Sequence, residues 1–186
     1  WSMLEAQHSI SFFHDLLWMQ TNDCNIFGFD PFTGEIKNEI LDTCTDVPGN
    51  SGKYVGHYSP TFFETIIISR VSAGGGGGRS FVAGYDEFNG RLLWQWFSVP
   101  PSGGDPEWDF NDAAKGNINP YPGDWGANDL IGGGSIFSLI AVDESTGIIY
   151  FPTGAPALSY DASLRPGPNL YANSIVALDA NTGKMI

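Results

Sequence analysis

The chain has 186 residues, of which 42% are hydrophobic and only 16% are charged. This balance excludes a disordered polyelectrolyte, and the length is sufficient for one domain with a buried core. The net charge of −13, with only eight basic residues, excludes a nucleic-acid-binding surface, which needs clustered Lys and Arg. It also argues against binding to an anionic membrane surface. We therefore expect an acidic protein whose charge keeps it in solution.

No signal peptide is visible at the start of the given sequence. The first residues, "WSMLEAQHSI", lack the basic stretch and apolar stretch of a signal peptide, and no apolar run is long enough to predict a membrane span. The chain starts without Met and ends at "NTGKMI", inside an expected strand. We therefore expect a fragment of a longer protein.

One short pattern recurs along the chain: a hydrophobic residue, Asp, three further residues and Gly. The four copies are "GFDPFTGEI" (28–36), "GYDEFNGRL" (84–92), "AVDESTGII" (141–149) and "ALDANTGKM" (177–185), with Asp30, Asp86, Asp143 and Asp179. Asp can accept backbone N–H bonds across a turn, and Gly can supply a positive φ. Each copy therefore predicts a hairpin that is closed by its own turn.

The segments around these turns are short and rich in β-branched and aromatic residues, as strands are. In chain order they are "NIFGF" and "EIKNEI", "SFVAGY" and "RLLWQWFSV", "IFSLIAV" and "IIYFPTG", and "ANSIVAL" and "KMI". An irregular repeat of all-strand units with one fixed turn per unit indicates propeller blades. We expect an all-β fold, a β-propeller segment of about three four-stranded blades over residues 1–186, in which Trp94 and Trp96 pack blade against blade.

Two long loops interrupt the repeat, at 100–134 and 154–174. The first is rich in Pro, Gly, Asn and Asp, and its aromatic residues predict that parts of it pack down: Trp108, Phe110, Tyr121 and Trp125. Its acids could bind Ca²⁺, but their spacing is not that of an EF-hand loop, so a solvated loop is favoured: Asp105, Glu107, Asp109 and Asp112.

The two cysteines, Cys24 and Cys44, lie on either side of the first predicted hairpin. A disulfide between them is one expectation if the protein is exported, and two buried free thiols are the other. The sequence leaves both open.

At this point the residues resemble a known family. The stretch "IGGGSIFSLIAVDESTGIIYFPTGAPALSYDASLRPGPNLYANSIVALDANTGK" is similar to the quinoprotein alcohol and methanol dehydrogenases, which use pyrroloquinoline quinone (PQQ). "LLWMQTNDCNIFGFDPFTGEI" and "GYDEFNGRLLWQW" resemble the blade motifs of the same family. The resemblance implies an eight-bladed propeller with PQQ at its axis and a Ca²⁺ or lanthanide ion bound to the quinone. It also implies a location in the periplasm or outside the cell.

Carrying the family's site over residue by residue gives an incomplete set. The Trp that stacks beneath PQQ falls on Phe137, and the Thr of the Gly-rich stretch falls on Ser135, which keeps a hydroxyl. The metal-binding Asn falls on Ala155 and the metal-binding Glu falls near Gly75. Since Ca²⁺ and lanthanides need oxygen ligands, losing both side chains removes most of the metal site.

Other family positions are also changed. The adjacent cysteines that cover PQQ fall near Ser2 and Met3, and the Arg that follows them falls near His8. The catalytic Asp is expected beyond Ile186, so the catalytic residues are not identified. His57 falls where the family has a PQQ-contacting Thr, and either a ligand in a changed pocket or an ordinary packed histidine would explain it.

Two glycine runs have structural and functional interpretations. Gly74–Gly78 could cradle an anion through its N–H groups, but a flexible turn is favoured because no phosphate-loop pattern follows. Gly132–Gly134 precedes a strand, and a structural role with close backbone approach is favoured there.

The sequence thus supports two hypotheses and a weaker third. The first is a segment of a quinoprotein-like propeller with lost or altered PQQ and metal binding and a structural or binding role. The second is an active PQQ-dependent alcohol dehydrogenase with a divergent pocket that uses His57 and Phe137. The third is a piece of an assembled filament or cell-surface complex. In each case the rest of the propeller, or other protein chains, must cover the open blade edges.

Overall fold

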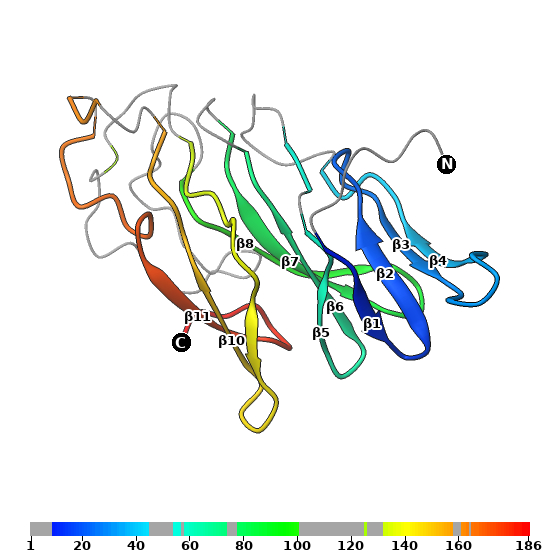
Figure 1. The fold of residues 1–186 in the computed structure, drawn as a ribbon. Helices are drawn as coiled ribbons and strands as arrows, with labels where there is room; N and C mark the ends of the chain where they lie inside the picture. The colour runs from blue at the N-terminus through cyan, green and yellow to red at the C-terminus, as the bar shows by residue number, and fades with distance from the viewer. Residues whose placement is uncertain are drawn as a thin grey trace.

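The computed structural model describes residues 9–44, 54–56, 58–73, 78–100, 125, 132–157, 161–163 and 165–186. Within these ranges the chain forms three antiparallel sheets that follow one another side by side, coloured blue, green and yellow to red in Figure 1. No helix long and apolar enough to cross a membrane is found in these ranges. The expected all-β propeller segment is confirmed.

The first two sheets are four-stranded meanders. The first has the order β1-β2-β3-β4 and the second the order β5-β6-β7-β8. Their strands are β1 (Ser11–Phe13), β2 (Leu16–Gln20), β3 (Ile26–Phe29), β4 (Ile36–Ile40), β5 (Thr61–Phe63), β6 (Ile66–Val71), β7 (Phe81–Asp86) and β8 (Leu92–Phe97).

The third sheet has three described strands in the order β11-β10-β9. They are β9 (Ala141–Asp143), β10 (Ile148–Pro152) and β11 (Ile175–Asp179). A single bridge between Leu178 and Met185 adds the next pairing at the outer side of β11. Four strands were expected here, so the described part of this sheet is smaller than predicted. The expected strand "IFSLIAV" is also shorter than predicted, since only its end belongs to β9.

The four repeated turns have the predicted geometry. In the first, Asp30 Oδ1 accepts hydrogen bonds from the backbone N–H groups of Phe32 and Thr33 at 2.9 Å, and Gly34 N donates to the Asp30 carbonyl at 2.9 Å. The same N–H···O=C bond closes the other three turns, and the four turn glycines have φ between 68° and 72°. That region of φ favours glycine, so the sequence pattern follows from the backbone geometry.

The turn aspartates should make the hairpins sensitive to acid. Hydrogen bonds from Ser145 and Thr146 lower the pKa of Asp143 below its ordinary value of 3.8. A lowered folded-state pKa gives stability that is present above pH 3.8 and is lost as the pH falls through the folded pKa. Asp143→Asn should therefore lower the melting temperature at neutral pH. The difference from the unmodified protein should shrink in acid, and thermal denaturation at both pH values measures it. A difference that is constant across this pH range would contradict the prediction.

Two apolar clusters join the sheets. The first sheet packs on the second through Trp18, Ile26, Ile67, Phe81 and other buried residues. The second packs on the third through Ile68, Trp94, Trp96, Phe151, Leu178 and others. β6 is therefore buried on both faces, and all six of its residues are buried. The fold thus stacks sheet on sheet, as propeller blades require.

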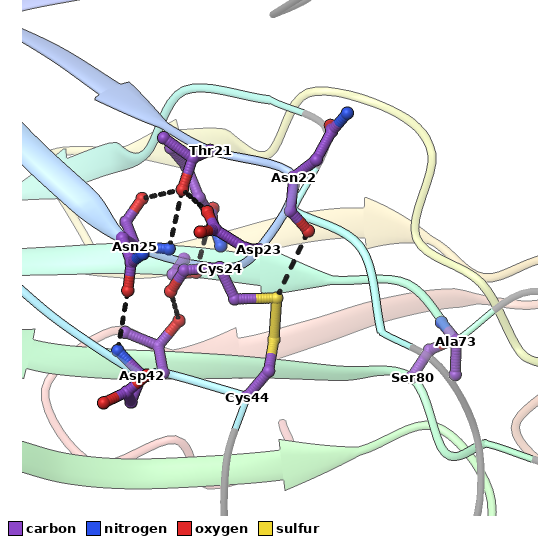
Figure 2. The surroundings of a disulfide bond; sticks show 12 residues. Thr21, Asn22, Asp23, Cys24, Asn25, Asp42, Cys44, Ala73 and Ser80 are labelled. Atoms are coloured by element: carbon purple, nitrogen blue, oxygen red, sulfur yellow. Dashed lines mark hydrogen bonds between the residues drawn. A yellow bond between two sulfur atoms is a disulfide. The ribbon is translucent and has the colours of Figure 1, made fainter. Parts of the chain in front are cut away.

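A disulfide links Cys24 and Cys44, with the two Cα atoms 5.7 Å apart. Figure 2 shows it joining the turn before β3 to the segment after β4. The alternative of two free thiols is wrong, because the described cysteines are both bonded. Closing a loop of this size typically stabilises a folded chain by about 3 kcal/mol.

Candidate functional site

The Gly-rich segment 132–134 lies where the second and third sheets meet. Gly133 forms one bridge with Arg79 and another with Pro156. Its φ is 85°, and a Cβ atom on it would lie 2.4 Å from the backbone nitrogen of Ala157. Only a glycine permits this approach of three backbone segments. The favoured structural role of the segment is supported.

This junction brings three of the predicted site residues together. Gly134 N donates to the Ala155 carbonyl at 2.9 Å, and Gly154 N donates to the Ser135 carbonyl at 2.8 Å. Ser135, Phe137 and Ala155 therefore belong to one region, built from the segment before β9 and the loop after β10. The packing of backbone on backbone fixes their relative positions.

A shallow hollow of about 230 Å³ lies beside this junction. Its lining is Ser135, Phe137, Ser138, Pro152, Thr153 and Gly154. Phe137 is 53% exposed, so part of its ring faces the hollow and solvent. The Thr153 hydroxyl is committed to the fold, since it donates to the Tyr171 carbonyl at 2.5 Å. The hollow thus offers an aromatic face and little else that is chemically reactive.

Among the described residues, no Asp, Glu, His or Cys side chain lines the hollow. Ala155 is exposed, and its side chain has no oxygen. No group of three or more His, Cys, Asp or Glu side chains gathers anywhere in the described ranges. The other predicted positions, His57 and Gly75, lie outside the described residues, as do the acids of the 100–134 loop. Their positions relative to the hollow are therefore not part of the description.

The loops around the hollow are tied down by specific contacts. Trp125, from the 100–134 loop, is buried and donates from Nε1 to the Leu170 carbonyl at 2.8 Å. Its prediction as a packed aromatic residue is confirmed, while Trp108, Phe110 and Tyr121 lie outside the described residues. In the 154–174 loop, Arg165 Nη1 donates to Asn169 Oδ1 at 2.6 Å. These contacts join Trp125 to the 154–174 loop and link two residues within that loop.

One buried group near the site was not singled out by sequence reasoning. Arg70 is the next-to-last residue of β6 and is almost completely buried. The available signal was a single charged residue within the otherwise uncharged run "IIISRV". Such a residue in a central strand needs a reason, because a charge is rarely buried without a partner.

Comparison with known proteins gives a consistent result. The model of the family described as PQQ, glucose/ethanol/alcohol dehydrogenase, β-propeller domain, matches residues 14–186. Quinohemoprotein alcohol dehydrogenase of Comamonas testosteroni is 33% identical over 142 residues, covering 73% of this chain and 19% of that protein. Quinohemoprotein alcohol dehydrogenase ADH IIB of Pseudomonas putida is 30% identical, covering 97% of this chain and 25% of that protein.

The solved structure of the Comamonas testosteroni enzyme has the same architecture. It superimposes with a TM-score of 0.75 at 28% identity, covering 95% of this chain and 26% of that chain. The chain therefore spans about a fifth to a quarter of the length of the relatives it matches.

Proposed function

Because this chain belongs to the family of the PQQ glucose/ethanol/alcohol dehydrogenase β-propeller domain, we propose that it serves as a segment of a larger quinoprotein-like propeller with an altered cofactor site. In this proposal, metal binding is lost and the segment has a structural or binding role. The observation that carries the proposal is Ala155. It directly follows Gly154, which lines the hollow, and it stands where the resemblance expects a metal-binding Asn.

The residues present do not fit the family's metal ion. A hard cation needs several oxygen ligands with negative charge among them. The Ala155 side chain is a methyl group, and its carbonyl already accepts a hydrogen bond from Gly134. We therefore derive no chemical step through a metal ion at this position.

A second candidate function is supported by Phe137. Its exposed ring forms one wall of the hollow, next to Ser135. A planar quinone such as PQQ, which supplies two-electron oxidation when bound, could stack on this ring. This observation favours the alternative of an active PQQ-dependent alcohol dehydrogenase with a divergent pocket. In that case Phe137 would orient the ring and Ser135 would line its edge.

The face of the first sheet that does not pack on the second sheet supports a larger assembly. Within the chain, Ile40 of the first sheet packs against the turn glycine Gly90 of the second, and Trp94 of the second packs against Gly183 of the third. Gly34, the matching glycine of the first sheet, instead lines an apolar hollow of about 470 Å³. We propose that another blade of the longer protein, or another chain, covers this hollow.

The Cys24–Cys44 disulfide supports a location outside the cytoplasm, in the periplasm or at the cell surface. Structural disulfides form and persist mainly in such oxidising compartments. This part of the proposal is tested by locating the full-length protein in cell fractions.

Reconstitution tests the proposed loss of the metal site. The full-length protein is incubated with PQQ and either Ca²⁺ or a lanthanide, and bound quinone is measured by absorbance beside a dye-linked alcohol oxidation assay. We expect neither stoichiometric quinone nor turnover. The matched variant Ala155→Asn shows whether one restored ligand raises metal affinity. Stoichiometric PQQ with turnover in the unmodified protein would overturn the proposal and support the divergent enzyme.

A further inference from the structure

Arg70 occupies a position that normally holds an apolar residue. It lies in β6, the strand of the second sheet that is buried on both faces, and its exposed fraction is 1%. Ile66 and Ile68 share its face of the strand and belong to the cluster that packs on the third sheet. The Arg70 side chain is therefore enclosed between two sheets.

The guanidinium of Arg70 has no hydrogen-bond acceptor among the described residues. Its Nε, Nη1 and Nη2 atoms are all buried and unpaired there. The guanidinium stacks on the ring of Tyr58, whose centroid lies 4.5 Å from Cζ. Burial lowers the pKa of Arg70 to about 10, so the group stays positively charged at neutral pH. A buried charge in this state is strongly unfavourable unless an anion pairs with it.

A second unpaired donor lies on the same face of the same sheet. Val82 is the register partner of both Arg70 and Trp96, so the three side chains form one row across β6, β7 and β8. Trp96 is 1% exposed, and its Nε1 has no acceptor within the described ranges. Arg and Trp side chains are donors only, so neither can satisfy the other.

We propose that the Arg70 guanidinium, which stacks on Tyr58 and shares a cross-strand row with Val82 and Trp96, is a buried site for a carboxylate. The planar fork of a guanidinium matches the two oxygens of a carboxylate, and a further oxygen lone pair can accept the indole N–H. The site requires neither the quinone nor the metal of the proposed function, so it goes beyond that function. The carboxylate comes either from a small bound acid or from an acidic side chain elsewhere in the full-length protein.

Arg70→Met tests the proposal through the sign of its effect. Methionine has a similar reach and no charge. If Arg70 is paired with a carboxylate, its replacement leaves that anion buried alone and should lower the melting temperature of the full-length protein by about 5 °C. If Arg70 is unpaired, the same replacement removes an unpaired buried charge. An unchanged or higher melting temperature would therefore overturn the proposal.

Titration with acetate and citrate, at constant ionic strength against chloride, separates the two sources. For a small bound acid, the melting temperature of the unmodified protein rises with carboxylate concentration, and that of Arg70→Met does not. For an acidic side chain, Arg70→Met is destabilised equally in every buffer and the unmodified protein shows no carboxylate response. Both results support the site.

Two further variants keep the test decisive if Arg70→Met does not fold. Arg70→Lys keeps the charge, so its melting temperature should fall by no more than half of the decrease seen for Arg70→Met. A decrease as large as that of Arg70→Met, or failure of both variants to fold, would rule out pairing of the charge as the cause. Arg79→Met is the matched control, because Arg79 is also buried and stacked on a ring, but it donates to the Val99 carbonyl. It should lose stability and keep any response to carboxylate.

Discussion

Trp94→Ala should lower the free energy of unfolding by about 4 kcal/mol, the typical cost of removing a fully packed Trp side chain. Trp94 is 3% exposed, and its Nε1 donates to the Ala180 carbonyl of the third sheet at 2.9 Å. A Cβ atom on Gly183 would lie only 2.6 Å from its ring. The indole therefore fills the space between two sheets and satisfies a buried carbonyl. Its loss leaves both a cavity and an unpaired acceptor.

Chemical denaturation of the full-length protein measures this effect. Trp94→Phe retains most of the packing and loses only the hydrogen bond to Ala180, so it should cost about 1 to 3 kcal/mol. Leu93→Ala is the control, since its side chain is the neighbour on the exposed face of the same strand. It should cost under about 1 kcal/mol. A Trp94→Ala effect as small as that of Leu93→Ala would show that the second and third sheets are not held together by this residue.

Gly133→Ala should destabilise the protein by about 3 kcal/mol or more. A residue with a Cβ atom at φ 85° is strained by about 1 to 2 kcal/mol. The added methyl group would also meet backbone atoms of Ala155, Pro156 and Ala157 at 2.4–2.8 Å. Backbone cannot rotate away as a side chain can, so the bridges from Gly133 to Arg79 and Pro156 must open.

The same denaturation measurement reports whether the junction between the second and third sheets loosens. Gly154→Ala is the matched control in the same region. Its φ is not positive, and its Cβ would lie 3.2 Å from the Ser135 carbonyl, so it should cost about 1 kcal/mol or less. Equal effects for the two variants would contradict the role assigned to the conformation of Gly133.

The sequence predicted the hairpins closed by the Asp-to-Gly turns, such as β3–β4 and β7–β8, better than the β1–β2 and β5–β6 hairpins. Each of the Asp-to-Gly turns has an Asp and a Gly at fixed spacing, and this pattern directly indicates the hydrogen bonds and the positive φ of the turn. The β1–β2 turn has His14 and Asp15 at φ 44° and 62°, and the β5–β6 turn has Glu64 at φ 51°. No glycine marks these turns, because the packed strands on either side hold ordinary residues in a conformation that they rarely adopt alone.

The candidate site was predicted only in part. Similarity to the family placed Ser135, Phe137 and Ala155. The structure brings Ser135 and Phe137 to one hollow, with Ala155 directly after its lining residue Gly154, because the backbones of the Gly-rich segment and the loop after β10 pair there. Arg70 could not be recognised in the same way. Its meaning depends on the two sheets that enclose it and on the absence of an acceptor among the described residues, which no local pattern contains.

What the sequence by itself determined is therefore local: the strands, the Asp-to-Gly turns and the acidic, all-β character of the chain. These follow from short-range hydrogen bonding and allowed φ values, which neighbouring residues control. The tertiary structure alone decided that Cys24 and Cys44 are bonded, that Phe137 stays exposed and that Arg70 is enclosed. Each of these depends on contacts between segments that are far apart in the sequence, because such contacts decide which side chains are buried and which are bonded.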